Sequence, residues 1–116
     1  MATNNCYHLL KQQLIATSTY LSLVISEPIA AEGNSAWASF LVTTLTGTTP
    51  QLTLKLDGSY NGGKTWRDAN GTTSIIPGNI HLSWNPNSFP LLRLRASITG
   101  TSAQAILDGW IAFGNR

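Results

Sequence analysis

The sequence predicts an all-β protein, an antiparallel β-sandwich of the jelly-roll or immunoglobulin-like type with about eight short strands. Two stretches alternate strictly between apolar and polar residues, and several others are rich in β-branched and aromatic residues. Gly, Pro and Asn residues separate these stretches. A chain of 116 residues suits a single domain with one core. We expect an N-terminal arm over residues 1–18 and the sandwich over residues 19–116.

The N-terminal segment contains the only helical candidate, residues 8–16, in which Leu10 and Leu14 are four positions apart. This stretch is barely two turns long and lacks a strong N-cap, so we do not expect a helix. We interpret residues 1–18 as an arm that becomes ordered on contact with a partner. Its candidate contact residues are Tyr7, Leu10 and Leu14.

The clearest strand signals are two alternating stretches, residues 51–57 and 92–98. Their inward-facing residues are expected to be Leu52, Leu54 and Leu56 in the first, and Leu92, Leu94, Ala96 and Ile98 in the second. Composition predicts further strands at residues 19–26, 36–45, 65–68, 73–76, 80–84 and 105–113.

One short sequence occurs twice, as Thr-Gly-Thr-Thr-Pro-Gln at residues 46–51 and as Thr-Gly-Thr-Ser-Ala-Gln at residues 99–104. Each copy joins one expected strand to the next. Because Gly adopts positive φ without strain, we predict a tight hairpin turn at both places, and hence two similar strand-turn-strand units.

The most distinctive motif lies at residues 59–66. It has the spacing Ser-x-Asp-x-Gly-x-Thr-Trp of the Asp-box turn of sialidases and other β-propellers, with Asn61 in place of Asp. The oxygen of Asn61 can accept backbone N–H bonds inside the turn, and the two glycines permit positive φ. A single copy cannot build a propeller, so we interpret the motif as a folding device. Its residues are Ser59, Asn61, Gly62, Gly63, Thr65 and Trp66.

Charged residues make up only 10% of the chain, with 7 Lys+Arg and 5 Asp+Glu. The surface must therefore consist of uncharged polar residues or be covered by other chains. The cations form no run, which disfavours nucleic-acid binding. Arg93 and Arg95 alternate on one strand face, and with Lys64 and Arg67 they are candidates for a small basic patch. A solvated face or ion pairs to a neighbouring subunit are favoured over nucleic acid as its role.

No catalytic residues, metal site or cofactor are expected. His8 and His81 are far apart and neither has an acid at ligand spacing, while Cys6 is the only cysteine. Asp57, Asp68 and Asp108 each stand beside Gly or Ala at an expected strand end, where a turn role explains them.

The four tryptophans are many for this length. Trp37 and Trp110 lie in strand patterns and are expected in the core or at an interface. Trp84 is expected in a loop, where it is a candidate to stack on a ligand or a partner.

The sequence lacks the features of a secretory signal, and no apolar run reaches the roughly 18 residues of a membrane helix. The expectation is a soluble protein that stays in the compartment where it is made.

Taken together, these segments resemble small β-sandwich structural proteins of tailed bacteriophages. The resemblance covers roughly residues 36–114 and is carried by residues 45–50, 52–59, 62–66, 92–95 and 97–102. Related sequences commonly read Ser-Asn-Asp-Gly-Gly-x-Thr-Trp, where this chain has Tyr60 and Asn61. These are fold motifs, so they bear on architecture more than on role.

The resemblance implies a virion protein on the capsid surface, most simply a decoration or cement protein that binds the major capsid protein. Such a protein would be made in the host cytoplasm, form a homo-oligomer, here a trimer, and bridge capsomers by multivalent contacts without a cofactor or enzymatic activity. A tail or neck component of the virion is the alternative within the same class. A carbohydrate-binding sandwich module, with Trp84 and Trp66 stacking on sugar rings, is the alternative from another class.

Overall fold

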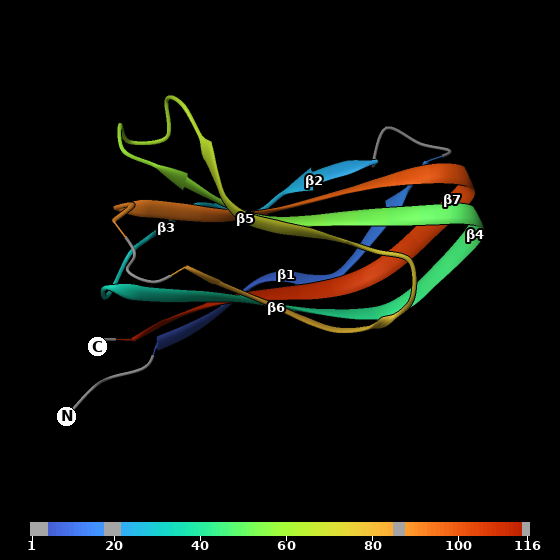
Figure 1. Ribbon diagram of the computed structural model, residues 1–116, viewed down its shortest axis with the longest axis horizontal. Coiled ribbons are helices and arrows are strands. Elements are labelled where there is room, and N and C mark those ends of the chain that lie inside the picture. Colours follow the sequence, from blue (N-terminus) through green and yellow to red (C-terminus); the bar gives the residue numbers. More distant parts are fainter. Residues whose placement is uncertain (1–4, 18–21, 85–87, 115–116) are drawn as a thin grey trace.

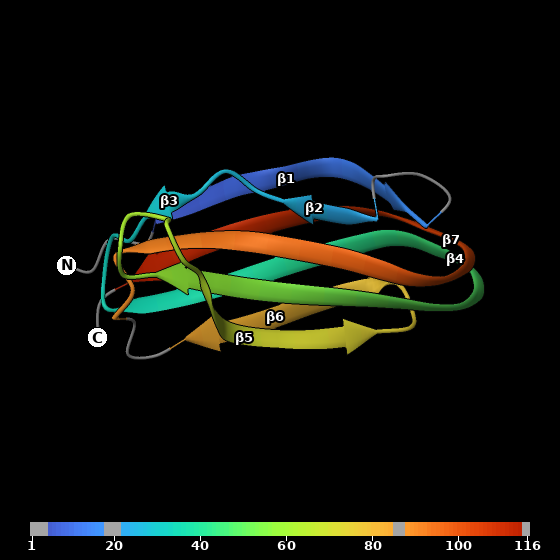
Figure 2. The same cartoon turned by 90° about the horizontal axis from the view of Figure 1, so that it is seen from above.

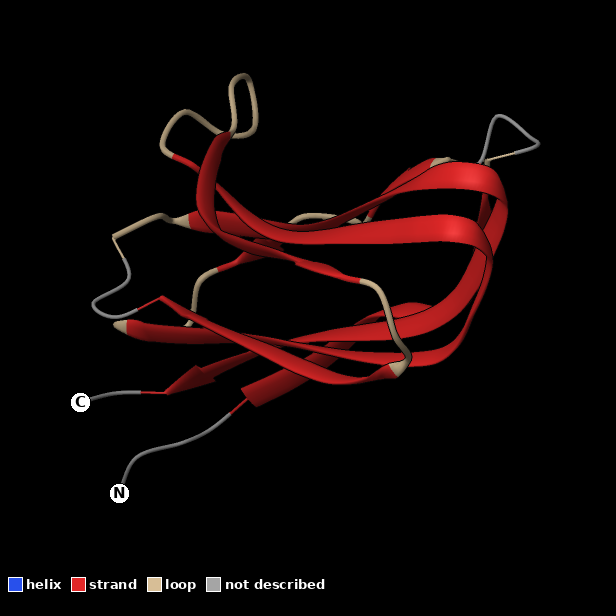
Figure 3. Ribbon diagram, turned by 45° about the vertical axis from the view of Figure 1, so that its right-hand side comes forward, coloured by secondary structure: helices blue, strands red, loops and turns tan. Residues whose placement is uncertain are grey.

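The computed structural model describes residues 5–17, 22–84 and 88–114, which form an all-β structure (Figure 3). No helix long and apolar enough to cross a membrane is found among these residues. The strands are β1 (Asn5–Ala16), β2 (Leu23–Ile25), β3 (Ile29–Ala30), β4 (Ser35–Ser59), β5 (Arg67–Ser74), β6 (Gly78–Trp84) and β7 (Leu91–Gly114).

The fold is built around β4 and β7, which are 25 and 24 residues long and pair antiparallel along their whole length. Both strands bend sharply near their middle, so a single hydrogen-bonded sheet folds over into two layers (Figure 1). In the β1/β6 layer, the first half of β4 and the second half of β7 lie between β6 and β1. In the β2/β5 layer, the other halves lie between β5 and the short strands β2 and β3 (Figure 2).

The bend lies at the repeated sequence, and the two copies pair with each other. Thr46 pairs with Gln104, and Gln51 pairs with Thr99, so a local two-fold axis relates residues 46–51 to residues 99–104. Gly47 and Gly100 have φ of 119° and 127°, and Thr49 and Ser102 have φ of 47° and 50°. The prediction of two hairpin turns is wrong, because the positive-φ residues bend continuous strands instead of reversing the chain.

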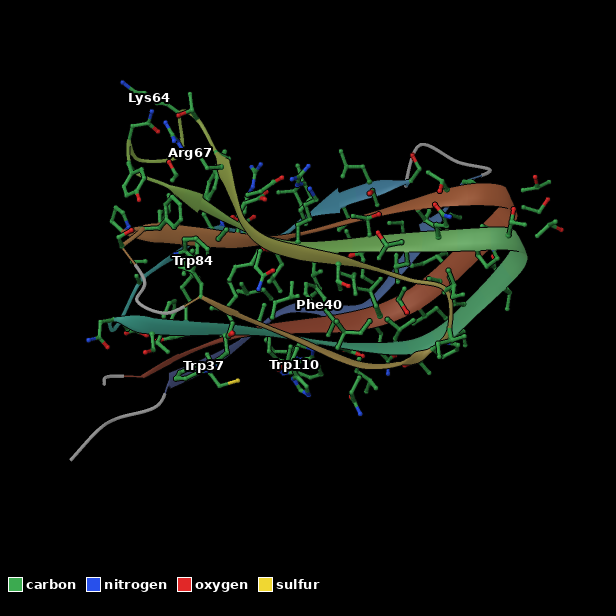
Figure 4. The ribbon with its side chains drawn as sticks, in the orientation of Figure 1. Trp37, Phe40, Lys64, Arg67, Trp84 and Trp110 are labelled. Atoms are coloured by element: carbon green, nitrogen blue, oxygen red, sulfur yellow. The ribbon has the colours of Figure 1, made fainter. Side chains whose placement is uncertain are left out.

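The core fills the space between the layers, and both predicted alternating stretches are present. Leu52, Leu54 and Leu56 face inward from β4 with 0% exposure. The inward residues of the first half of β7 are Leu92, Leu94, Ala96 and Ile98, all at most 3% exposed. Phe40 reaches into the same space from the opposite layer (Figure 4).

Strand number and length differ from expectation. The stretches expected as separate strands at 65–68 and 73–76 belong to one strand, β5, over Arg67–Ser74. The stretches expected as separate strands at 36–45 and 51–57 are one strand, β4, and those at 92–98 and 105–113 are one strand, β7. The expected strand at 19–26 corresponds to β2 over Leu23–Ile25 only, and residues 18–21 lie outside the described residues.

The N-terminal segment also differs from expectation. Residues Asn5–Ala16 form an edge strand of the sandwich, paired with β7 from Asn5↔Phe113 to Ala16↔Gln104. Leu10 and Ile15 are buried in the core at 3% and 0% exposure. The expected arm is therefore not present over this range, and residues 1–4 lie outside the described residues.

Candidate functional site

The segment Ser59 to Trp66 forms a tight turn at the end of β4, held together by its own side chains. The backbone hydrogen bond predicted for the Asn61 oxygen is present, since Oδ1 accepts from the Thr65 N–H at 3.0 Å. In addition, Asn61 Nδ2 donates to Thr65 Oγ1 at 2.8 Å. Ser59 Oγ accepts from the Gly63 N–H at 2.9 Å. Gly62 and Gly63 have φ of 74° and 91°. The amide side chain of Asn61 thus performs the structural role that a carboxylate has in the Asp-box spacing.

The turn is joined to β7 through Trp66. The guanidinium of Arg93 lies over the indole ring of Trp66, with Cζ 4.1 Å from the ring centroid, in a cation–π contact. Trp66 is half-buried, and its ring lies beside Gly63. A Cβ atom added to Gly63 would be 3.5 Å from the nearest Trp66 ring atom. The packing fixes the turn against the outer face of the β2/β5 layer.

Arg93 and Arg95 both pair with Asp57, which lies opposite Arg93 on β4. Asp57 Oδ2 accepts from Arg93 Nε at 3.1 Å and from Arg95 Nε at 3.0 Å, and Oδ1 accepts from Arg95 Nη2 at 3.2 Å. The Asp57 side chain is only 1% exposed. Its carboxylate is therefore covered by the two arginines, which remain 19% and 31% exposed themselves.

The ion-pair network continues to β5. Arg95 Nη2 donates to Asp68 Oδ1 at 2.6 Å, and Lys55 Nζ donates to Asp68 Oδ2 at 2.8 Å. The hydrogen bond from Lys55, followed by the charges of Lys55 and Arg95, lowers the pKa of Asp68 below its ordinary value of 3.8. The turn roles expected for Asp57 and Asp68 are wrong, because both residues lie within strands and pair with cations.

Two of the four residues of the expected basic patch, Arg93 and Arg95, are therefore paired with carboxylates. The network holds three cations and two carboxylates, which leaves a net charge of +1. In the described part of the chain, Lys64 and Arg67 form no ion pair, and they project from the turn region (Figure 4). The geometry supports a solvated face that keeps a positive charge, with Lys64 and Arg67 unpaired at its end among the described residues.

Trp84 does not lie in an exposed loop. It is the last residue of β6, half-buried and packed against the core, with its ring centroid 5.9 Å from that of Phe89 (Figure 4). Its Nε1 is buried without a hydrogen-bond partner among the described residues. The prediction of a loop-borne tryptophan is wrong because the β6 pattern extends to residue 84, and the ring follows the inward face of that strand.

An aromatic row on the outer face of the β1/β6 layer was missed by sequence reasoning. Four residues lie side by side across four strands: His8 pairs with Trp110, Trp110 with Ser39, and Ser39 with His81. The rings of His8 and Trp110 stack at 4.5 Å with an angle of 11°. Trp37 lies on the same face, and both tryptophans point away from the core (Figure 4).

Hydrogen bonds tie this row together. Asp108 Oδ1 is 2.9 Å from His8 Nε2 and accepts from the Gln12 backbone N–H at 2.9 Å. Ser39 Oγ is 2.8 Å from His81 Nδ1. The 100 residues that separate His8 from Asp108 in sequence explain why no spacing signal could reveal the pair. Asp108 therefore holds a bulge of β1 against β7, and the turn role expected for it is wrong.

The candidate contact residues of the N-terminus are distributed differently. Leu10 is buried in the core, while Leu14 is 45% exposed at the edge of the sandwich. Tyr7 is half-buried and donates a hydrogen bond to Glu32, which raises the pKa of Tyr7 above its ordinary value of 10.0. Of the three, Leu14 is the one available to a partner.

The described residues contain no cluster of three or more His, Cys, Asp or Glu side chains that could hold a metal ion. An open hollow of about 340 Å³ lies beside Lys55 and Asp68 over the exposed face of Gly71. Its other lining residues are Thr53, Asn70, Thr72 and Thr73. The ion pair between Lys55 and Asp68 lies at its edge.

Comparisons with known proteins add little. No protein-family model matches the chain, and no curated protein matches its sequence. One solved structure with a similar chain trace is described as the crystal structure of PirA. The similarity covers 96% of this chain and 92% of that one, at 13% identity and a TM-score of 0.49. At that level of similarity we draw no inference about function.

Proposed function

We propose that the chain is a virion structural protein of a tailed bacteriophage, a capsid decoration protein that binds the major capsid protein on the outer shell. The observation that carries the proposal is the chemistry of the surface. Five of the charged side chains neutralise one another over Asp57 and Asp68, and most of the remaining surface presents hydroxyl, amide and apolar groups. Such a surface suits burial against other proteins, because few charges need to be desolvated.

In this proposal the protein acts by binding alone, without cofactor or catalysis. A rigid sandwich held by two continuous strands would bridge neighbouring capsomers, and a trimer would multiply modest contacts by multivalency. The finer fold assignment, a jelly-roll or immunoglobulin-like sandwich, belongs to the same proposal, and the two antiparallel layers support it. A tail or neck position in the virion would use the same surface chemistry.

The proposal is tested by co-sedimentation of the purified protein with candidate tailed-phage capsids. We expect saturable binding and a higher temperature of shell disruption when the protein is bound. Binding should persist at high salt, because few ion pairs are available to be screened. A protein that leaves shells unbound and unstabilised would contradict the decoration role and shift attention to tail and neck assemblies.

The carbohydrate-binding alternative now rests on a different surface. Trp84 is half-buried against the core, and Arg93 covers one face of the Trp66 ring, so both rings are less available than expected. The outer face with Trp37 and Trp110, next to His8 and Asp108, is the surface that favours this alternative. Oligosaccharide titration followed by tryptophan fluorescence tests it. A signal that Trp110→Ala abolishes would favour sugar binding over the virion role.

A further inference from the structure

The structure describes four sheet edges, and three of them carry features that hinder the addition of another strand. A sheet edge presents unpaired backbone groups, and proteins protect such edges with charges, bulges or short strands. β1 is interrupted by two register shifts, and Gln12 within it has a φ of 42°. β2 and β3 are three and two residues long, and β5 carries Arg67 and Asp68. In β5, the Asn70 side chain also accepts a hydrogen bond from the Gly71 N–H at 2.8 Å.

The fourth edge, β6, has none of these features. Its sequence is Gly-Asn-Ile-His-Leu-Ser-Trp, without Lys, Arg, Asp, Glu or Pro. It pairs with β4 from Ala36↔Trp84 to Val42↔Gly78 without a register shift. The strand runs along one long side of the molecule (Figure 2). β6 is therefore a regular, uncharged edge of seven residues.

The backbone groups of β6 alternate between bonding to β4 and pointing away from it, as in any antiparallel ladder. The Ser83 carbonyl points away, because it accepts a hydrogen bond from Asn70 Nδ2 of β5 at 2.9 Å. By the same alternation, the N–H and C=O groups of Asn79 and His81 point away from β4 as well. Within the described residues, these groups of Asn79 and His81 have no hydrogen-bond partner. The Ser83 carbonyl keeps a second lone pair.

A second copy of β6, running antiparallel, matches these outward groups. With His81 opposite His81 of the second copy, Asn79 lies opposite Ser83, and each pair can exchange N–H···O=C bonds. On the inner face the same register places Ile80 opposite Leu82, two residues that pack on the core, so apolar side chains meet. The contact is the same in both directions, so it has two-fold symmetry and brings no like charges together.

We propose that two copies of this chain associate through β6, which pairs antiparallel with itself and joins the two β1/β6 layers into one continuous sheet. An extended backbone is required, because its donors and acceptors have the spacing of the outward groups on β6. The occupant is a second copy because β6 is the unprotected edge among the described strands. In a solution of this chain, the open edge that matches it is another β6.

This contact goes beyond the proposed function and does not depend on it. A two-fold pair uses the β6 edge, whereas a three-fold decoration trimer would use another surface of the molecule. Pairing and shell binding can therefore fail separately. A dimer that ignores shells leaves the contact intact, while a protein that binds shells and never pairs contradicts it.

The test is the solution mass by light scattering over a range of protein concentrations. We expect the mass of the unmodified chain to rise with concentration from 12.5 kDa towards twice that value. His81→Pro should remain at the mass of one chain, because it removes an outward N–H and keeps the hydrogen bonds to β4. His81→Thr is the matched control, since it changes the same side chain, retains the N–H and should still pair.

A charge at the same position gives a second test that does not depend on proline. His81→Lys places two lysines opposite each other in the pair, which should abolish association at low salt and restore part of it at high salt. Leu41→Lys, at a 37% exposed residue of β4, should associate like the unmodified chain. Far-UV circular dichroism checks that each variant keeps its strands.

Several results would overturn pairing through β6. The unmodified chain could remain at the mass of one chain at every concentration, which would leave the edge to a strand of another protein. Its mass could stop at three chains. Association could survive in both His81→Pro and His81→Lys, or be lost equally in His81→Thr, and either result would place the contact elsewhere than on the backbone of β6.

Discussion

At the scale of single residues, Asp57 organises the outer face of the β2/β5 layer. Its carboxylate is 1% exposed and accepts hydrogen bonds from both Arg93 and Arg95. Removing one partner of a buried pair leaves the other charge without compensation, which costs more than the pair itself contributes. The two arginines keep some contact with water, so the penalty is smaller than for a fully buried pair.

We expect Asp57→Asn to lower the free energy of unfolding by about 2 kcal/mol, because charged hydrogen bonds to two guanidiniums are lost. Urea denaturation followed by tryptophan fluorescence measures this. The comparison is Lys55→Met, which removes an exposed ion pair to Asp68 and should cost less than about 1 kcal/mol. Equal losses in the two variants would show that Asp57 has no special role.

The lowered pKa of Asp68 should make the stability of the protein depend on pH. Lys55 and Arg95 lower its pKa in the folded protein below the ordinary value of 3.8. The stabilisation from this group is therefore complete above the unfolded pKa and is lost as the pH falls through the lower, folded pKa. Thermal unfolding of the unmodified chain and of Asp68→Asn should differ at pH 6 and converge in acid, once the pH lies below the lowered pKa of Asp68 in the folded protein. A difference that is independent of pH would contradict this.

At the scale of elements, the bend depends on two glycines. A side chain on Gly100 would lie 2.9 Å from the carbonyl oxygen of Thr49 and 3.0 Å from that of Thr48, in addition to the unfavourable φ of 127°. We expect Gly100→Ala to destabilise the protein by more than about 1 kcal/mol. Gly62→Ala is the matched control, since its φ is also positive but nothing lies within 4 Å of the added atom. Its loss should be smaller in the same thermal scan.

The edge strand β1 is expected to be necessary for folding. Because Leu10 and Ile15 are buried and β1 pairs along the second half of β7, removal of residues 1–16 should expose the core and prevent folding. Circular dichroism and solubility of the truncated chain measure this. A truncated chain that unfolds cooperatively like the full one would show that β1 is a dispensable arm.

Particular elements show what sequence reasoning could predict. The leucines of residues 51–57 and 92–98 were assigned to the core because a half-buried strand has a two-residue period. In β1 this period is lost at register shifts between His8 and Leu10 and between Leu10 and Gln13, so the sequence pattern of residues 5–16 does not indicate a strand. The two glycine-containing repeats were recognised, but positive φ serves a hairpin and a bend equally well. Only the pairing of residues 46–51 with 99–104 distinguishes them.

In the candidate site, too, contacts between neighbours in sequence could be predicted and contacts between distant residues could not. The turn at residues 59–66 could be predicted because the hydrogen bonds among Ser59, Asn61, Gly63 and Thr65 join residues close in sequence. The ion pairs of Asp57 with Arg93 and Arg95 span 36 and 38 residues, so no local pattern contains them. The row from His8 to His81 likewise depends on which strands are neighbours. Trp84 was misplaced because Asn and Pro after it suggested an earlier loop.

At the scale of the whole molecule, the two layers are made from the same two strands. β4 and β7 each contribute one half to either layer, so neither layer is a separate piece of chain. Most pairings also join residues far apart in sequence, which is typical of slow-folding β proteins. Stability should therefore be shared across the molecule.

We expect a single cooperative unfolding transition, with coincident curves from far-UV circular dichroism and tryptophan fluorescence. The tryptophans sample both layers, since Trp37 and Trp110 lie on β4 and β7 of the β1/β6 layer and Trp66 packs on the β2/β5 layer. Two separated transitions would mean that one layer survives alone, which the continuous strands should prevent.

The pairing of β1 with β7 also determines how the protein would respond to mechanical load. Asn5 and Phe113 are paired near the two chain ends, on the side of the molecule away from the bend (Figure 1). A force that pulls the ends apart would open this pair first and then break the following hydrogen bonds one after another, as in a zipper. Tethering through both ends should therefore give a low unfolding force, whereas pulling between the bend and one end would load many hydrogen bonds in shear.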